Sequence, residues 1–209
     1  MNIEIKKAKV GILNYKCGNI NSIISVFDHL NSETIILKNS LSKNIENITH
    51  LVLPGVGSFG YCSKNFQKSK LDKIFKRFYK KKLPILSICV GMQLLGNSSE
   101  ESPDENGLNI FDFKVKKFDK NYNKYKVPHV GWNSVKFKKT IGKLKSNINY
   151  DFYFDHSFYV SKNKFEIGST NHGNKFCSVI EKDNVLSCQF HPEKSQENGI
   201  KFLEYFLSK

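Results

Sequence analysis

The sequence predicts an α/β fold, with an open, mostly parallel central sheet flanked by helices and an additional β-rich region in the second half. Short, continuously apolar runs in the first half alternate with segments whose apolar residues recur at helical spacing. Such runs are typical of a parallel sheet covered on both faces. The second half holds many short strand candidates separated by turns. The 209 residues contain no repeat and no Gly/Ser- or Pro-rich linker, so we expect one domain over residues 1–209.

The elements follow from local patterns along the chain. Apolar runs that end in polar, glycine or proline turns indicate strands, and apolar residues spaced three or four apart indicate helices. In the first half the expected strands are residues 10–13, 34–37, 50–53 and 84–88, and the expected helices are residues 20–30 and 71–78. In the second half the expected strands are residues 111–118, 134–137, 151–154, 166–170, 177–181 and 186–190, before a closing helix over residues 198–207. The polar, Lys-rich residues 121–126 are expected to form a surface loop.

The charge balance is strongly basic, with 33 Lys and Arg against 19 Asp and Glu, a formal net charge of +14. Arg77 is the only arginine, and the lysines are spread along the whole chain. Sequence-specific nucleic-acid binding relies on the bidentate fork of Arg, so we expect no nucleic-acid partner. The pattern favours a solvated, Lys-coated surface; the alternative is a basic patch that meets an acidic partner.

The ends and the cysteines indicate a reducing compartment. Residues 1–7 lack an apolar core segment, so we expect no signal peptide. No apolar run approaches the roughly 18 residues that a membrane span needs. Five cysteines with no CxxC pair are an odd number without metal-like spacing. We therefore expect a cytoplasmic protein with free thiols, no metal site and no membrane partner.

A candidate nucleophile follows the fourth predicted strand. Residues 84–88 run directly into Cys89, Gly91 follows two residues later, and a helix is expected to start at once. This order resembles a nucleophile elbow, in which a sharp turn lifts the reactive atom above the sheet. A thiolate there is stabilised by helix N–H groups, and the Val90 N–H points to where an oxyanion would form. The alternative is a buried structural cysteine.

A candidate base lies near the end of the chain. An apolar strand delivers His191, and Glu193 follows two residues on, so the imidazole can take the thiol proton while the carboxylate orients the ring. Taken alone, a histidine near a glutamate is more often structural. Glycines directly after the strand at 50–53, in residues 54–60, form either a tight turn or a second wall of an oxyanion hole.

Four motifs, in this order along the chain, resemble those of the class I glutamine amidotransferases, and within them the glutaminase subunits of imidazole glycerol phosphate synthases. The motifs are Pro-Gly-Val-Gly-Ser-Phe-Gly at 54–60, Cys-Val-Gly-Met-Gln-Leu-Leu at 89–95, Pro-His-Val-Gly-Trp-Asn at 128–133 and Gln-Phe-His-Pro-Glu-Lys-Ser at 189–195. The resemblance implies a class I glutamine amidotransferase-like fold and hydrolysis of L-glutamine to glutamate and ammonia, with no cofactor. It implies a catalytic triad of Cys89, His191 and Glu193.

The resemblance also implies the remaining site residues and a partner. The oxyanion hole would comprise Val56, Gly57 and Val90, and the glutamine contacts would be Gly57, Gln93, Ser157 and Phe158. In the family, ammonia passes to a (β/α)8 cyclase subunit, which makes imidazole glycerol phosphate and aminoimidazole carboxamide ribotide in histidine biosynthesis. The heterodimer contacts implied are Asn19, Pro128, Val130, Trp132 and Lys194. The alternative for Trp132 is packing in the core.

Some positions depart from the family pattern. Ser87 stands where glycine is usual, Asn14 and Lys16 replace aspartate and glycine, and Phe158 replaces tyrosine. These departures leave a second hypothesis open, namely a paralogous glutaminase that supplies ammonia to a sugar-modifying synthetase in surface-glycan or flagellin assembly. A third hypothesis is a catalytically silent, basic binding module, which would bind nucleic acid in a salt-sensitive way.

Overall fold

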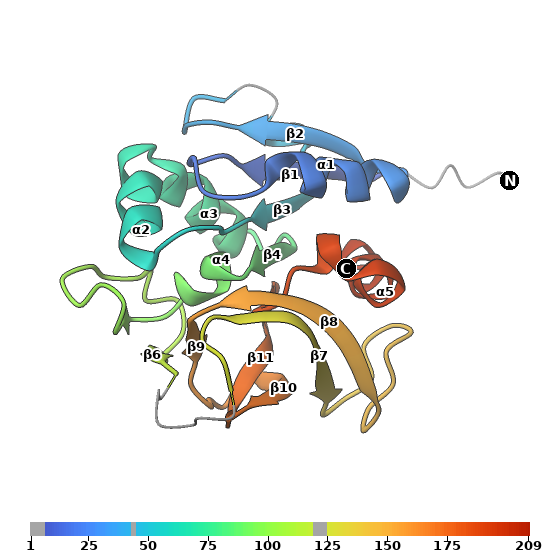
Figure 1. The fold of residues 1–209 in the computed structure, drawn as a ribbon. Helices are drawn as coiled ribbons and strands as arrows, with labels where there is room; N and C mark the ends of the chain where they lie inside the picture. The colour runs from blue at the N-terminus through green and yellow to red at the C-terminus, as the bar shows by residue number, and fades with distance from the viewer. Residues whose placement is uncertain (1–6, 43–44, 119–124) are drawn as a thin grey trace, which may run out of the picture.

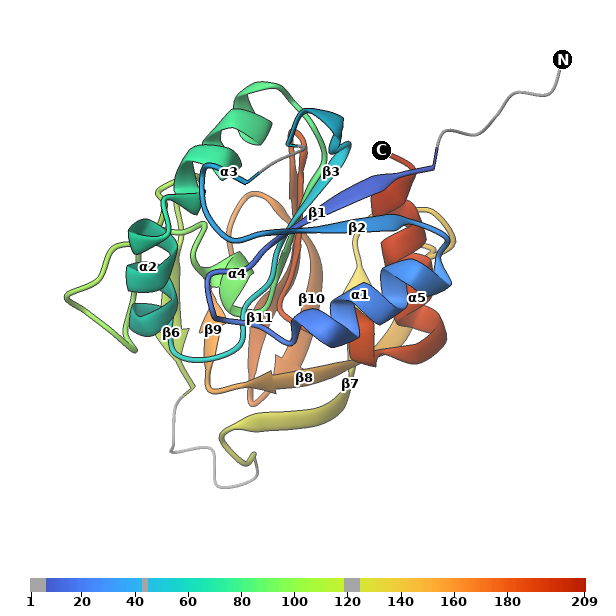
Figure 2. The same ribbon diagram turned by 90° about the horizontal axis from the view of Figure 1, so that it is seen from above.

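The computed structural model describes residues 7–42, 45–118 and 125–209 of the chain. In these residues one mixed sheet runs through the molecule with helices on both sides (Figure 1). Its first-half elements are β1 (Lys9–Leu13), α1 (Ile20–His29), β2 (Glu33–Leu37), the 3-10 turn η1 (Ile45–Asn47), β3 (His50–Leu53), α2 (Phe59–Lys68), α3 (Leu71–Lys80) and β4 (Ile85–Ile88). Helices α1 and α5 (Gln196–Leu207) cover one face, and α2 and α3 cover the other (Figure 2).

The second half adds mainly antiparallel strands to the same sheet. Its elements are α4 (Val90–Gln93), β5 (Ser98–Ser99), β6 (Lys114–Lys117), β7 (His129–Phe137), β8 (Asn149–His156), β9 (Phe158–Val160), β10 (Glu166–His172), β11 (Asn174–Lys182), β12 (Val185–Cys188) and the 3-10 turn η2 (Pro192–Lys194). The sheet order is β2-β1-β3-β4-β12-β11-β10-β7-β8. The pairs among β2, β1, β3, β4 and β12 are parallel, and those from β12 onward are antiparallel.

The parallel strands set the position of the candidate site. The carboxyl ends of neighbouring parallel strands lie at one edge of a sheet, where the following loops meet and ligands usually bind. Strands β3, β4 and β12 are neighbours, so the segments that begin at Pro54, Cys89 and Gln189 converge at that edge. The backbone N–H of His191 donates to the carbonyl of Tyr153 over 2.9 Å, which joins β8 to the same edge.

The predicted fold class is confirmed: a parallel sheet between helices is followed by a β-rich region. Each expected strand of the first half is present to within a residue or so of its predicted bounds. Helix α2 was not predicted, because the glycine-rich motif before it suggested a loop. Its buried side holds Phe59, Cys62 and Phe66 at helical spacing, but it also includes Gly60 and Ser63, which weaken the apolar pattern in the sequence.

The second half differs from the prediction mainly in strand length. The strand expected over residues 111–118 is wrong for its first part, since Phe111 and Phe113 are buried in an irregular segment and only β6 is a strand. Strands β7 and β8 are each about twice as long as predicted, because they extend into residues of low strand propensity, such as Gly131 in β7 and Asn149 and Asp155 in β8. Trp132 is 49% exposed, so the core-packing alternative for this residue is wrong.

Two predictions concern chain segments that lie partly outside the described residues, namely the missing signal peptide at residues 1–7 and the loop at residues 121–126. Among the described helices, none has the length and apolarity needed to cross a bilayer. The five cysteines are all free thiols.

Candidate active site

Cys89 lies at the end of β4, where the strand turns directly into the single-turn helix α4. Its backbone has φ 52° and ψ −112°, a positive φ that a residue other than glycine adopts only at an energetic cost. Its N–H donates to the Cys188 carbonyl over 2.8 Å, which holds the turn against β12. Strain of this kind at a strand-to-helix turn is typical of a nucleophile elbow.

The loop after β3 packs against this elbow without room for side chains. A Cβ on Gly55 would lie 2.2 Å from the backbone nitrogen of Gly91, and a Cβ on Gly91 would lie 2.3 Å from the carbonyl oxygen of Leu53. Gly57 has φ +120°, which also favours glycine. The Val56–Gly57 peptide therefore lies beside the turn that carries Cys89, and its carbonyl accepts a bond of 3.8 Å from the Cys62 Sγ.

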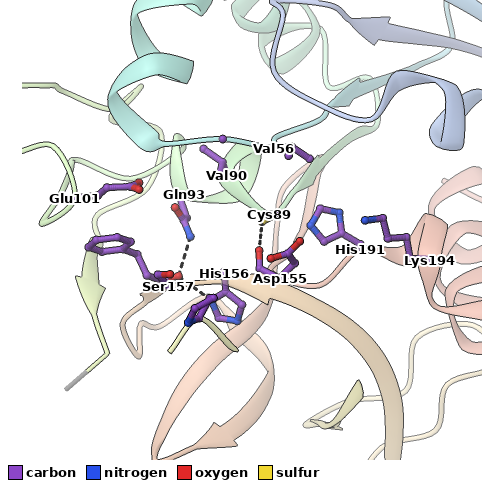
Figure 3. Close-up of a pocket in the computed structure, with 13 residues that line it drawn as sticks. Val56, Cys89, Val90, Gln93, Glu101, Asp155, His156, Ser157, His191 and Lys194 are labelled. Atoms are coloured by element: carbon purple, nitrogen blue, oxygen red, sulfur yellow. Dashed lines mark hydrogen bonds between the residues drawn. The ribbon is translucent and has the colours of Figure 1, made fainter. Parts of the chain in front are cut away.

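The contacts of the Cys89 thiol differ from those expected. Helix α4 has only four residues, so its macrodipole contributes little to stabilising a thiolate. Cys89 Sγ donates to the Asp155 carbonyl over 3.9 Å (Figure 3), and the Gln189 Nε2 donates to the Cys89 sulfur over 3.6 Å. The Gln189 Oε1 accepts a bond of 3.1 Å from Gln93 Nε2, which also donates to the Phe158 carbonyl over 3.0 Å. The side-chain amides of Gln189 and Gln93 thus form a buried, hydrogen-bonded row that ends at the thiol.

His191 and Glu193 form a buried pair beside Cys89. The His191 Nδ1 lies 2.8 Å from Glu193 Oε1, and the two side chains are 3% and 2% exposed. A carboxylate only accepts hydrogen bonds, so Nδ1 donates and Nε2 is left for the thiol. Burial lowers the pKa of His191, but the neighbouring Cys89 and Glu193 outweigh it and raise the pKa to about 10. Figure 3 shows the His191 ring next to Cys89.

Cys89, Gln93 and His191 line one cavity of about 310 Å³. It is lined by Val56, Gly57, Cys89, Val90, Gln93, Glu101, Pro128, Asp155, His156, Ser157, Phe158, His191 and Lys194 (Figure 3). The residues expected for the oxyanion hole and for glutamine contacts all line this cavity. Segments far apart in the sequence therefore meet around a space large enough for an amino acid.

The residues expected at a partner interface divide into two groups. Pro128 and Lys194 line the cavity, whereas Asn19, Val130 and Trp132 lie outside it. Val130 and Trp132 are 55% and 49% exposed, so β7 presents two apolar side chains to solvent. Asn19 accepts a bond from the Ser22 N–H over 3.4 Å and so caps α1.

Sequence reasoning missed four residues at the site: Glu101, Asp155, His156 and Gln189. Glu101 follows the short strand β5, and its Oε2 accepts a 2.7 Å bond from the N–H of Phe59, the first residue of α2. No spacing in the sequence ties it to the cavity. Gln189 lies two residues before His191, and this spacing at a strand end could have indicated that both side chains point the same way.

Two departures from the family pattern have visible local effects. The Ser87 side chain is fully buried in β4, and its hydroxyl has no hydrogen-bond partner among the described residues. Lys16 has φ 67°, a conformation that favours the glycine usual at this position. Neither residue lines the cavity. Within the described ranges, no group of three or more His, Cys, Asp or Glu side chains is arranged to hold a metal ion.

Comparisons with known proteins agree with this architecture. The family model described as glutamine amidotransferase class-I matches residues 12–209. The chain is 37% identical over 201 residues to imidazole glycerol phosphate synthase subunit HisH 1 of Campylobacter jejuni, covering 95% of this chain and 98% of that protein. It is 41% identical over 200 residues to the HisH subunit of Caldanaerobacter subterraneus subsp. tengcongensis, covering 94% of this chain and 96% of that protein.

Solved structures share the fold at lower sequence identity. A crystal structure of a glutamine amidotransferase superposes with a TM-score of 0.72 at 15% identity, over 95% of this chain and 97% of that chain. The structure of PurLQS from Thermotoga maritima gives 0.73 at 13% identity, over 97% and 98%. Because the family model spans nearly all of the sequence and the two HisH relatives align over almost their full lengths, the chain belongs to the class-I glutamine amidotransferase family.

Proposed function

We propose that this chain is the glutaminase subunit of an imidazole glycerol phosphate synthase, acting as a single domain over residues 1–209. It hydrolyses L-glutamine and passes the ammonia to a cyclase subunit. The observation that carries the proposal is the convergence of the strained Cys89 turn and the buried His191–Glu193 pair on one cavity. The HisH names of relatives that align over nearly the whole chain support the choice of pathway.

The proposed reaction proceeds through a thioester. The Cys89 proton passes to His191 Nε2, because the raised pKa of His191 favours a thiolate–imidazolium pair, and the thiolate attacks the side-chain amide carbon of glutamine. The N–H groups of the Val56–Gly57 peptide and of Val90 stabilise the oxyanion. His191 returns the proton to the departing nitrogen, so ammonia leaves and a glutamyl thioester remains. Water, deprotonated by His191, then attacks the thioester and releases glutamate and the free thiol.

Glu101 gives the cavity its selectivity for an amino acid. The ammonium group of glutamine needs an anionic acceptor, and this carboxylate lies at the cavity wall near Ser157 and Phe158, whose backbone we expect to bind the substrate. Glu101→Gln keeps an oxygen for the Phe59 N–H but removes the charge. We expect it to raise the glutamine KM about tenfold to a hundredfold, as loss of a charge-assisted bond implies.

Glu100→Gln is the matched control for this prediction. Glu100 precedes Glu101 in the same loop, but its carboxylate accepts a 2.8 Å bond from the Lys117 N–H and does not line the cavity. Steady-state glutaminase assays on both variants in complex with the cyclase subunit give the two KM values. An unchanged KM in Glu101→Gln, or an equal rise in both variants, contradicts the assignment.

We propose that the cyclase partner is a (β/α)8 barrel that docks over the mouth of the cavity. Val130 and Trp132 are exposed apolar side chains on β7, and tryptophan is enriched at binding hot spots. Lys194 lies at the same mouth, with its Nζ 5.4 Å from the centre of the Tyr153 ring. The partner would cover these groups and receive ammonia without loss to solvent. We place the complex in the cytoplasm, in keeping with the five free thiols.

Complementation tests the pathway. A histidine auxotroph that lacks its HisH-type subunit, supplied with this chain and its cognate cyclase subunit, is expected to grow without histidine. The Cys89→Ala variant is the control and is expected not to support growth at low ammonia. Failure of the unaltered chain to restore growth, despite measured glutaminase activity, would instead favour the sugar-modifying paralog, which no relative cited above supports.

A further inference from the structure

Two buried histidines lie side by side under the cavity. His129 on β7 and His156 on β8 are opposite each other in the strand register, and they are 4% and 7% exposed. Their Nδ1 and Nε2 atoms, respectively, are 2.9 Å apart. His156 lines the cavity floor (Figure 3), whereas His129 lies one strand away and stacks on His172 with ring centres 3.9 Å apart. The reaction described above uses none of these three rings.

The hydrogen-bond partners assign every proton along this pair. His156 Nδ1 lies 2.8 Å from the Phe158 carbonyl, which only accepts, so Nδ1 carries the hydrogen. In a neutral ring Nε2 is then an acceptor, and the hydrogen between the rings belongs to His129 Nδ1. The remaining His129 Nε2 accepts a 3.1 Å bond from the Asn133 Nδ2. The result is a chain of donors that runs in one direction, from Asn133 through His129 and His156 to Phe158.

Burial keeps the His129 and His156 rings neutral, as the chain of donors requires. Burial is the largest cause that lowers the pKa of each ring, and the nearby histidines add to it, so that both pKa values fall to about 3. An added proton on either ring would place two donors face to face. His172 provides a contrast within the same stack, because its Nε2 lies 2.9 Å from the Lys126 carbonyl and must be the protonated nitrogen.

The two ends of the chain of donors are fixed by other bonds. The second hydrogen of Asn133 Nδ2 goes to the Asn171 carbonyl over 3.1 Å, and its Oδ1 accepts from the Ser134 N–H over 2.8 Å. At the other end, the Phe158 carbonyl also accepts from Gln93 Nε2 over 3.0 Å. Two donors, His156 Nδ1 and Gln93 Nε2, therefore hold this carbonyl, and the peptide that follows Phe158 has a single orientation.

We infer that His129 and His156 are positioning residues for glutamine binding: through directional hydrogen bonds that begin at Asn133, they fix the Phe158 carbonyl and so hold in place the cavity wall at Ser157 and Phe158 against which the substrate lies. This inference deepens the proposed function and rests on it. It also links the cavity to β7, whose exposed Val130 and Trp132 lie between His129 and Asn133 in sequence. A partner that docks on those side chains contacts the strand from which the chain of donors starts.

Nitrogen NMR tests the proton positions without any assay of activity. In the ¹⁵N-labelled full-length protein near neutral pH, we expect His129 and His156 to be neutral with the hydrogen on Nδ1. We expect His172, when neutral, to carry its hydrogen on Nε2. A spectrum in which His129 or His156 is protonated on Nε2, or in which either ring is charged at neutral pH, overturns the inference.

Matched substitutions test the consequence for the substrate. An asparagine amide replaces the Nδ1 side of a histidine, and a glutamine amide replaces the Nε2 side. His156→Asn thus keeps a donor for Phe158, whereas His156→Gln removes it. In complex with the cyclase subunit, we expect His156→Gln to raise the glutamine KM about tenfold with kcat nearly unchanged, and His156→Asn to raise it about threefold or less.

The same comparison at His129 separates positioning from simple packing. His129→Asn keeps the donor to His156, but His129→Gln lets His156 take the other tautomer and lose its bond to Phe158. We expect His129→Gln to raise KM as His156→Gln does, and the double glutamine variant to be no worse than either single variant. Packing loss alone would lower thermal stability in all four variants and leave the Asn and Gln forms with equal KM values, which would overturn the inference.

The outcomes also separate this inference from the proposed function. If the unaltered complex hydrolyses glutamine and Cys89→Ala abolishes that activity, the proposed function stands whatever the histidine variants show. Equal KM values in the Asn and Gln pairs then overturn only the positioning role. If the complex has no glutaminase activity, the proposed function fails, and the nitrogen NMR result still decides whether the directional chain of donors exists.

Discussion

Replacing Cys89 by alanine is expected to lower glutamine hydrolysis by the complex by at least about a thousandfold, since removal of a catalytic nucleophile leaves only the contributions of binding and the oxyanion hole. Without the sulfur no thioester forms, and the His191–Glu193 pair has no thiol to deprotonate. The measurement is glutamate release in the presence of the cyclase partner. The same variant should still support the synthase reaction when ammonia is supplied directly, because the cyclase subunit is untouched.

Cys177→Ala is the matched control for that experiment. Cys177 is also fully buried, but it lies on β11, and its Sγ faces the Val179 carbonyl rather than the cavity. We expect this variant to keep glutaminase activity within about threefold once its folding is verified, since removing a small buried group costs stability rather than chemistry. Glutamine turnover that survives in Cys89→Ala, or disappears equally in both variants, would rule out Cys89 as the nucleophile.

His191→Gln is expected to give the second large loss, also about a thousandfold in kcat, because loss of the base of a triad costs nearly as much as loss of its nucleophile. The glutamine amide can still accept or donate one hydrogen bond, but it cannot take up and return a proton. The binding groups of the cavity remain in place, so the glutamine KM should change little. A kcat reduced less than about tenfold would show that another group transfers the proton.

A chemical probe separates this prediction from misfolding. The thiol of Cys89 should react with a small alkylating reagent faster in the unaltered chain than in His191→Gln, because the imidazole next to it favours the thiolate. Pretreatment with glutamine should protect the thiol in both proteins. If His191→Gln left the alkylation rate unchanged, the ring would not be acting on the sulfur.

The parts of the fold that could be predicted are those with a short-range signature. The strands around residues 50–53 and 84–88 are continuously apolar, and the residues after them change abruptly to glycine, proline or cysteine. The nucleophile and base candidates both lie directly after such strands. The resemblance to class I glutamine amidotransferases implied that Cys89 and His191 belong to one triad, and the parallel pairing of β4 with β12 explains how the two strand ends meet.

The parts that could not be predicted depend on contacts between distant segments. Glu101 reaches the cavity because the loop after β5 folds over the start of α2, and no local pattern encodes that contact. His129 and His156 face each other through the register of β7 and β8, and both residues lie outside the predicted bounds of these strands. Helix α2 was missed for a different reason: the loop signal before it outweighed its interrupted apolar spacing.

The close approach of Gly55 and Gly91 has a consequence for redesign of this enzyme. With a hypothetical Cβ on either residue 2.2 Å or 2.3 Å from the opposing backbone, the two loops fit each other as one unit. A graft that imports only one of them from another amidotransferase would carry a backbone shaped for a different counterpart. A transfer of substrate preference between members of the family therefore requires that both loops be transplanted as a pair, along with the strand ends that hold them.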